Sequence, residues 1–386
     1  MLFNSNRHQP RKRSYYPFSK NYPGKRGNSY DIGESRTRRK KDERNNIIFY
    51  ISLIFVFVAV FIASSVAIRL SERPIKSTAD TKAAEFNGAY KAIYMPDEAL
   101  DGGIAYDLFR TELSNADANA VVIDFKSNTG MLNYASANKI ASESEEYSDA
   151  QKIINTLKAG NYKIIARIYC FEDRIAASMI SGAGVREKGS NTIWLDESAQ
   201  NDGNPWLNPY SSAATNYLIS IVKESIDCGA DMILLASVSF PTGSRLENAV
   251  FTTDEDAKSK NETLLNFIKR AKDACGDIPL AVYMPADKAL NGSKMLYDGS
   301  IIDSAADYNV IDFRTESLSD GFEFDGKVFT KENFSENSLI QTAVPVLTDE
   351  KSESYPNKTI IPIINDKIYI SALENLGVSD YILIIE

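Results

Sequence analysis

Histidine is nearly absent from this 386-residue chain, whose only one is His8, close to the N-terminus. The rest of the sequence therefore excludes a Ser-His-Asp triad, a Cys-His pair and a metal site with histidine ligands. The three cysteines, Cys170, Cys228 and Cys275, are too few and too widely spaced for a disulfide framework. Two readings stay open: free, mostly buried thiols, or a pair between Cys228 and Cys275, each of which precedes a glycine.

Glycine-rich phosphate loops are also missing after the apolar runs that predict strands, which argues against nucleotide binding. We therefore expect neither a cofactor nor a metal. Chemistry outside the N-terminal arm must come from carboxylates, lysine, tyrosine or cysteine. A glycosidase needs only two carboxyl groups, so the composition favours that reaction over other hydrolases.

Charge is unevenly distributed along the chain. Residues 1–44 contain 13 Lys and Arg against 4 Asp and Glu, a net charge of +9, whereas the remainder carries −18. This arm has few aliphatic residues and no periodicity, so we expect it to be a disordered region. Nucleic-acid binding and contact with anionic lipid are the two alternatives for it. The apolar segment that follows favours lipid, and we expect no nucleic acid as partner.

A membrane-spanning helix is predicted at residues 45–68, which contain no charged side chain. Its 22-residue core, 47–68, would extend roughly 33 Å, enough to cross a bilayer core of about 30 Å. Basic residues precede it, so the positive-inside rule predicts a cytoplasmic tail and an extracytoplasmic C-terminal part. A signal peptide cleaved after residues 65–67 is the alternative, but the apolar run and the arm are long for one. We favour an uncleaved signal anchor in the cell membrane, followed by a polar linker at 69–88.

Residues 89–386 alternate between apolar, β-rich runs and helix-like stretches. Eight runs predict strands: 91–95, 120–125, 163–171, 231–240, 278–284, 308–313, 359–364 and 381–385. Several are apolar throughout, as expected of strands covered on both faces, and glycines follow four of the helix-like stretches. The pattern predicts a (β/α)8 barrel of the TIM type, with an open doubly wound sheet as the alternative.

A short internal repeat runs through this region. KAIYMPDEALDG precedes AVVIDFKS, and LAVYMPADKALNG precedes YNVIDFRT after a similar gap. Half-barrel symmetry and coincidence both remain open as explanations of two such short matches.

Four motifs resemble, in order and spacing, an uncharacterised bacterial family of glycosyl hydrolase domains. They are VVIDFKSNTGMLNY (121–134), YKIIARIYCFED (162–173), WLNPY (206–210) and GADMILLASVSFP (229–241). The resemblance extends over most of residues 89–386 and is strongest from 120 to 241. It implies a TIM barrel related to glycoside hydrolases.

Several residues match the motifs of that family, which reads VVIDVKDDTG, IARIVVFKD and W-x-N-P-Y in the first three blocks. The matching residues are Asp124, Lys126, Thr129, Gly130, Arg167, Phe171, Asp173, Trp206, Asn208, Pro209 and Tyr210. In the fourth block the family reads GFDEIQFDYVRFP. Here Ala236 replaces its second aspartate, Ser237 its tyrosine and Ser239 its arginine. A methyl or hydroxyl group cannot act as acid, base or nucleophile in glycoside hydrolysis at neutral pH.

The candidate catalytic carboxylates are therefore Asp124, Asp312 and Asp287. Asp124 ends a predicted strand, and Asp312 holds the equivalent place in the internal repeat. Solvated or ion-paired structural roles are the alternative for each. The candidate binding residues are Lys126, Arg167, Trp206, Asn208 and Tyr210. A buried Arg167 requires a partner such as Asp124, and the aromatic residues could equally be packed under a loop.

We accordingly predict a membrane-anchored, extracytoplasmic, glycoside-hydrolase-like barrel that has lost strong catalysis. Such a pseudoenzyme would bind a cell-wall or other polysaccharide at the cell envelope. An active glycoside hydrolase using Asp124 with Asp312 or Asp287 is the first alternative, and a protein-docking scaffold is the second.

Overall fold

A computed structural model of the chain describes residues 86–138, 140, 150–190, 192–251, 258–349 and 359–385. The predicted basic tail, the membrane-spanning segment and most of the linker lie outside these residues. Within the described part of the chain, no helix is both long enough and apolar enough to cross a bilayer.

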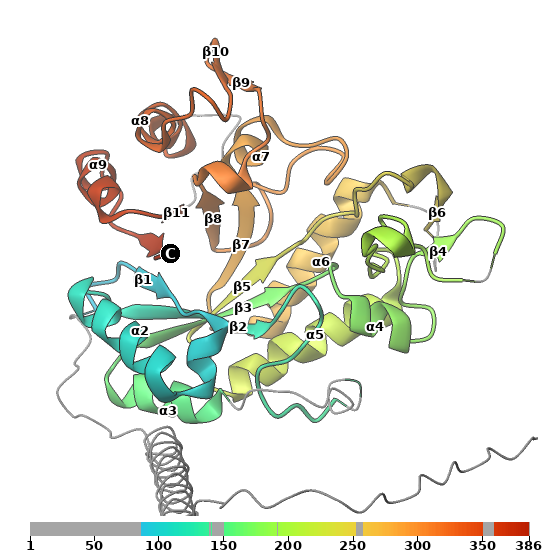
Figure 1. Cartoon of the computed structure of the whole chain (residues 1–386), viewed down its shortest axis with the longest axis horizontal. Coiled ribbons are helices and arrows are strands. Elements are labelled where there is room, and N and C mark those ends of the chain that lie inside the picture. The colour runs from blue at the N-terminus through green and yellow to red at the C-terminus, as the bar shows by residue number, and fades with distance from the viewer. Residues whose placement is uncertain are drawn as a thin grey trace, which may run out of the picture. The chain divides into compact units, whose positions relative to one another are not determined.

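Eight parallel strands close into a barrel and follow one another around it in sequence order (Figure 1). They are β1 (Lys91–Tyr94), β2 (Ala120–Lys126), β3 (Lys163–Tyr169), β5 (Met232–Ala236), β7 (Leu280–Pro285), β8 (Tyr308–Asp312), β11 (Thr359–Ile364) and β12 (Tyr381–Leu383). β1 pairs with β12 through Ala92 and Ile382, which closes the ring. The predicted (β/α)8 barrel is confirmed, and the open sheet considered as its alternative is wrong.

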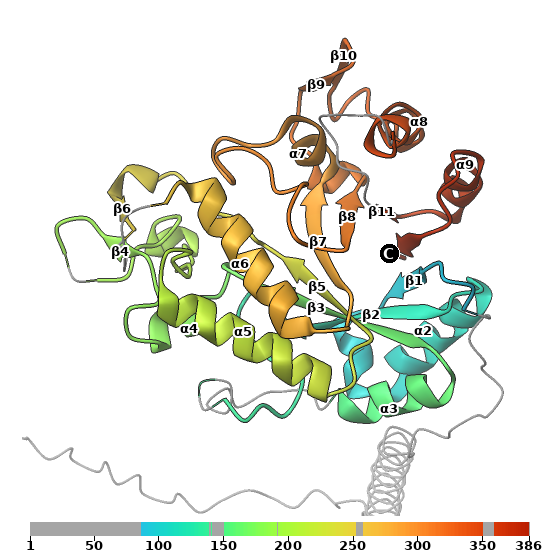
Figure 2. The ribbon, with the colours of Figure 1, turned by 180° about the vertical axis from the view of Figure 1, so that it is seen from behind.

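Helices cover the outside of the barrel. They are α2 (Gly103–Asn115), α3 (Gln151–Ala159), α4 (Arg174–Met179), α5 (Ser212–Asp227), α6 (Lys260–Cys275), α7 (Ala286–Asn291), α8 (Glu336–Leu347) and α9 (Ile370–Asn375). Figure 2 shows α5 and α6 side by side over the strands. The local sequence explains where they begin and end: Ser259 and Glu262 form a capping box at the start of α6, and Gly276 ends that helix.

Shorter elements follow the carboxyl ends of the strands. The 3₁₀ helices are η1 (Asp97–Asp101), η3 (Ala199–Asn201), η4 (Leu246–Asn248), η5 (Thr315–Ser317) and η6 (Lys367–Tyr369). Two antiparallel pairs join β4 (Arg186–Glu187) to β6 (Ala249–Val250) and β9 (Phe322–Phe324) to β10 (Lys327–Phe329). The sequence pattern predicted neither these pairs nor α4, α7 and α8.

β5 is shorter than predicted, because it ends at Ala236 rather than at residue 240. The next residue, Ser237, has a φ of 50°, a left-handed conformation that residues with a side chain rarely adopt. It turns the chain out of the strand although the sequence stays largely apolar.

None of the three cysteines forms a disulfide, so the alternative of a pair between Cys228 and Cys275 is wrong.

The core has two parts, as the barrel fold requires. A small cluster fills the inside of the barrel, and it includes Ala92, Val122, Ile165, Ala281 and Val310. A larger cluster lies between the strands and the surrounding helices. Since side chains alternate along a strand, the residue two positions after each member of the inner cluster also points inward, nearer the carboxyl end of the barrel.

Gly130 allows a tight packing contact in the turn after β2. Its φ is +93°, and an added Cβ would lie 2.0 Å from Oδ1 of Asp173. We expect Gly130→Ala to lower the free energy of unfolding by at least about 2 kcal/mol, since strain and overpacking both oppose it. Chemical denaturation would measure the loss. Gly326→Ala is the control: it also has positive φ but nothing within 4 Å of the added Cβ, so it reports the backbone strain alone.

Candidate functional site at the carboxyl end of the barrel

The barrel mouth is the end at which TIM-barrel enzymes hold their catalytic groups. Here the inward positions nearest the carboxyl ends of five of the strands carry polar side chains, whereas that of β5 carries Ala236. They are Tyr94 from β1, Asp124 from β2, Arg167 and Tyr169 from β3, Tyr283 from β7 and Asp312 from β8. We call this set the mouth layer. The inner cluster of small and aliphatic side chains lies directly beneath it.

Asp124 is held by an arginine and a tyrosine. Arg167 donates from Nε to Oδ1 and, at 2.8 Å, from Nη2 to Oδ2, while the hydroxyl of Tyr94 donates to Oδ2 at 3.0 Å. The guanidinium of Arg167 also lies between two rings, 4.5 Å from the centroid of Tyr94 and 4.9 Å from that of Tyr169. The expected pairing of Arg167 with Asp124 is confirmed. Burial opposes the charge of Arg167, but the hydrogen bonds to Asp124 and its negative charge outweigh burial. The pKa of the Arg167 guanidinium is therefore raised.

Asp312 is held in a similar way. Arg314 donates from Nε to Oδ1 at 3.0 Å and from Nη2 to Oδ2 at 2.9 Å, and the hydroxyl of Tyr283 donates to Oδ2 at 3.0 Å. The backbone N–H of Arg314 adds a further bond to Oδ1 at 3.0 Å. Burial and the neighbouring carboxylate of Asp312 raise the pKa of Tyr283. Both oxygens of Asp312 are thus already occupied.

The two tyrosine–aspartate contacts coincide with the internal repeat of the sequence. Tyr94 and Asp124 belong to its first copy, and Tyr283 and Asp312 belong to the second. β1 and β2 stand four strands away from β7 and β8 around the ring, on the opposite side of the barrel. This placement supports half-barrel symmetry as the explanation of the repeat.

Three further carboxyl groups lie near these units, and the sequence did not single them out. Burial, Asp124 and Glu98 raise the pKa of Asp97 to about 6, against an opposing effect of Arg167. Burial is also the main cause that raises the pKa of Glu172, and it raises the pKa of Glu336 to about 7. Carboxyl groups with raised pKa values next to ionised ones are a common feature of acid–base sites.

Glu172 lies close to the position of the missing family carboxylate. Its Oε2 accepts a hydrogen bond of 2.9 Å from the hydroxyl of Ser237, directly after Ala236. The backbone brings the two together, since the N–H of Phe171 donates to the carbonyl of Ser237 at 3.1 Å. The sequence offered one signal for Glu172, its place beside the matched Asp173 at the end of a strand.

A sequence profile of the family described as "Putative glycosyl hydrolase domain" matches residues 92–287, just over half of the chain. The chain belongs to this glycosyl hydrolase domain family. The match covers the strands from β1 to β7. It therefore includes Asp124 with its partners Tyr94 and Arg167, but not Asp312. No curated protein matches the sequence.

Three solved structures illustrate what the domain is similar to. A hypothetical protein from Ruminiclostridium thermocellum is 25% identical over 50% of this chain and 95% of its own, with a TM-score of 0.41. A Paenibacillus cycloisomaltooligosaccharide glucanotransferase is 16% identical over 73% of this chain and 40% of its own, with a TM-score of 0.45. The glycoside hydrolase domain of PelA from Pseudomonas aeruginosa is 11% identical over 78% and 99%, with a TM-score of 0.38.

Other residues predicted for the site of this glycosyl hydrolase domain lie apart from the mouth layer. A register shift after Asp124 pairs Lys126 with Ile168 of the outer cluster, and the fully buried ammonium group of Lys126 lies 2.9 Å from Oδ2 of Asp173. Asp287 is 2% exposed at the start of α7, where Lys288 contacts it at 2.8 Å. The structure therefore places Asp124, Arg167 and Asp312 at the mouth, where Asp124 contacts Arg167 and Asp312 lies on the opposite side, and it places Lys126 and Asp287 elsewhere.

The aromatic motif 206–210 is packed into the long connection between β3 and α5. Trp206 is half-buried and donates from Nε1 to Asp196 at 2.9 Å, while Asn208 is fully buried and accepts from the backbone of Tyr210. Tyr210 is half-buried against Phe240, with ring centroids 5.2 Å apart. Their contacts fit the alternative of aromatic packing under a loop.

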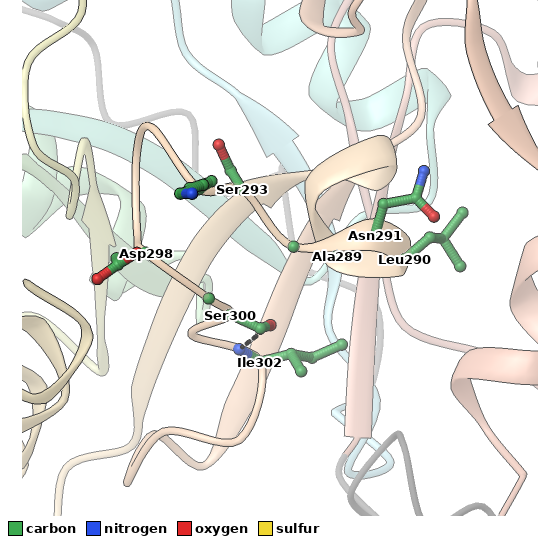
Figure 3. Close-up of a pocket in the computed structure, with 10 residues that line it drawn as sticks. Ala289, Leu290, Asn291, Ser293, Asp298, Ser300 and Ile302 are labelled. Carbon is green, nitrogen blue, oxygen red and sulfur yellow. Dashed lines mark hydrogen bonds between the residues drawn. The ribbon is translucent and has the colours of Figure 1, made fainter.

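An open depression of about 610 Å³ lies at the end of α7 and the turn that follows it (Figure 3). Ala289, Asn291, Ser293, Asp298 and Ser300 are among its lining residues. None of the candidate catalytic carboxylates lines it. Its polar groups are in part occupied within the turn, where Ser300 accepts a hydrogen bond of 3.2 Å from the backbone of Ile302.

Proposed function

We propose that this glycosyl hydrolase domain binds a carbohydrate at the barrel mouth and cleaves it slowly or not at all. The carrying observation is that Asp124 and Asp312, the carboxylates of the mouth layer, each have both oxygens bonded to an arginine and a tyrosine. A carboxylate whose two oxygens already accept these hydrogen bonds has no free position from which to pass a proton to the leaving sugar. Ala236, 2% exposed at the end of β5, offers only a methyl group.

The same mouth is suited to binding sugar. Three tyrosines of the mouth layer combine an apolar ring with a hydroxyl group, and ring faces pack well against the apolar faces of sugars. Tyr94 and Tyr283 already donate to aspartates, whereas the hydroxyl of Tyr169 makes no hydrogen bond within the described residues. We assign the domain to the extracytoplasmic side of the cell membrane, anchored through residues 45–68, where an envelope polysaccharide would be its ligand.

Hydrolysis is the second candidate function, and Glu172 is the observation that favours it. Its carboxyl group has a raised pKa and stands beside the strand end that lacks the family aspartate. With Glu172 as the acid, Asp124 would serve as the nucleophile or base. This pair would replace the predicted pairs of Asp124 with Asp312 or Asp287. A scaffold that docks proteins is the remaining alternative.

Titration of the full-length chain in detergent with cell-wall and polysaccharide fragments would test the proposal. We expect saturable binding, and reducing-end release no faster than that of the Glu172→Gln and Asp124→Asn variants. Losing one carboxylate of a working pair lowers the rate of a glycosidase by several orders of magnitude. Cleavage that both variants abolish would therefore establish the second candidate. Glu332→Gln, a change at an exposed residue outside the mouth layer, is the control. Neither binding nor cleavage would favour a protein partner.

A further inference from the structure

The open depression at the end of α7 lies on the same side of the barrel as the mouth layer. α7 begins directly after the carboxyl end of β7, and its six residues extend roughly 9 Å at about 1.5 Å per residue. The turn 292–300 that follows is tied to two other segments of this side. The backbone N–H of Phe240, just past the end of β5, donates to the carbonyl of Leu296 at 2.9 Å. The side chain of Asn261, in the first turn of α6, donates to the carbonyl of Ser300 at 2.8 Å.

Backbone contacts give the depression a fixed shape. The N–H of Ser293 donates to the carbonyl of Gly299 at 2.7 Å, and the N–H of Gly299 donates to the carbonyl of Ser293 at 3.3 Å. Gly292 has a φ of +67°, and a Cβ added there would lie 2.5 Å from the carbonyl oxygen of Gly299. The turn closes so tightly because position 292 has no side chain. The site is therefore preformed, as most small-molecule sites are.

The side chains around the depression have hydrogen-bonding capacity that the fold leaves unused (Figure 3). The exposed ammonium group of Lys294 and carboxylate of Asp298 form no hydrogen bond or ion pair with any described residue. Asn291 donates from Nδ2 to the carbonyl of Glu323 at 3.0 Å, but its Oδ1 accepts no bond from the described part of the chain. One cation, one anion and a neutral amide thus offer donors and acceptors without net charge.

An aromatic surface borders the turn. Tyr210 and Phe251 are both half-buried, and their ring centroids lie 5.2 and 5.4 Å from that of Phe240, which the turn bonds through its backbone. Asp298 lies close enough to add to the effect of burial in raising the pKa of the Tyr210 hydroxyl. A sugar can therefore place an apolar face on these rings and its hydroxyl groups over the depression.

We propose that the depression is an outer subsite of the mouth, and that the ligand is a long, uncharged polysaccharide whose chain runs from the mouth layer into the depression. The inference rests on the proposed function, because one glycan occupies both places. Each sugar hydroxyl both donates and accepts, so it can use the ammonium, carboxylate and amide groups together. A polyanion would be repelled by the net charge of −18 outside the N-terminal arm, and Lys294 opposes a polycation.

The test measures how affinity grows with chain length, by calorimetric titration of the full-length chain in detergent. The probes are two neutral series of two, four and six sugar units: cello-oligosaccharides and N-acetylated chito-oligosaccharides. For a series that binds, the Kd should fall by at least about tenfold from the disaccharide to the hexasaccharide, because further hydrogen bonds form in the depression. Oligogalacturonates of the same lengths, which are anionic, should gain no affinity with length.

A double variant shows where the gain arises. Lys294→Ala with Asp298→Gly removes both charged groups, and glycine suits the φ of 50° at position 298. The hexasaccharide should bind this variant at least about tenfold more weakly than the wild type, and the disaccharide should bind both equally. The matched control is Lys331→Ala with Asp325→Gly. It changes an exposed lysine and an exposed aspartate of the same φ outside the depression, and should keep the gain.

The outcomes separate this inference from the proposed function. Affinity that does not rise with length, or a gain that the double variant retains, overturns the outer subsite and leaves carbohydrate binding at the mouth intact. A gain with length for the oligogalacturonates overturns the uncharged class of ligand. Absence of binding for every series overturns both proposals.

Discussion

Lys126→Met should lower the free energy of unfolding by about 3–5 kcal/mol, because it leaves one partner of a buried ion pair uncompensated. The side chains of Lys126 and Asp173 are both 0% exposed, and their charged groups lie 2.9 Å apart. The ammonium group also donates to the backbone carbonyl of Tyr169 at 2.5 Å. Denaturant unfolding followed by tryptophan fluorescence would measure the change, since Trp194 is fully buried in the same domain.

A double variant distinguishes the lost pair from the lost volume. Asp173→Asn removes the charge, and asparagine can still accept the N–H of Ala176 that now caps α4. Lys126→Met with Asp173→Asn should therefore be more stable than the sum of the two single changes predicts, by about 1–3 kcal/mol. Lys269→Met is the control, because its pair with Asp273 is exposed and should contribute less than about 1 kcal/mol. A Lys126 variant no less stable than this control would contradict the interpretation.

The same measurement bears on the binding role predicted for Lys126 from the sequence. Lys126, Gly130 and Asp173 all match the family motif, and they form a packed unit: Gly130 lies against Asp173, which bonds Lys126 and caps α4. A loss of stability with unchanged sugar affinity would make this part of the motif structural. A loss of affinity without a loss of stability would support the predicted role in binding.

The sequence was most informative about the strands. Continuous apolar runs predicted all eight, because a barrel strand is buried on both faces and no alternation obscures the signal. It was less informative where the backbone departs from its pattern. The apolar residues after Ala236 continue the strand signal, but the left-handed conformation of Ser237 ends β5 there. α8 was missed for a related reason: Pro345 lies inside it and reads as a helix terminator.

Within the site, a contact was predictable where its two residues face each other on neighbouring strands. Arg167 lies inside an apolar strand and therefore required a carboxylate as partner. Asp124 is the residue paired with it on the neighbouring strand β2. Glu336, in contrast, belongs to a helix that was not predicted, and its neighbours come from β8, η5 and η6. Nothing in its local sequence distinguishes it from an exposed glutamate. Only the folded barrel brings an unpaired carboxyl oxygen to that place.

Glu336 should make the domain less stable as the pH rises from 5 to 8. Burial, with the charges of Glu316 and Asp312, raises its pKa from an ordinary value of 4.5 to about 7 in the folded state. Between these values the folded state keeps a proton that the unfolded state releases, so stability is greatest below the lower pKa, falls between the two pKa values and levels off above the upper one. At about 1.4 kcal/mol per pKa unit, the total loss is on the order of 3 kcal/mol.

Glu336→Gln isolates this contribution, because glutamine cannot ionise. The variant should be more stable than the wild type at pH 8 by up to about 3 kcal/mol and nearly equal to it at pH 5. The stability curve of the wild type must be subtracted from that of the variant, because Asp97, Glu172 and Asp380 also have raised pKa values. These groups make the free energy of unfolding of both proteins fall with rising pH. Parallel curves for the two proteins would show that Glu336 is not the buried acid described above.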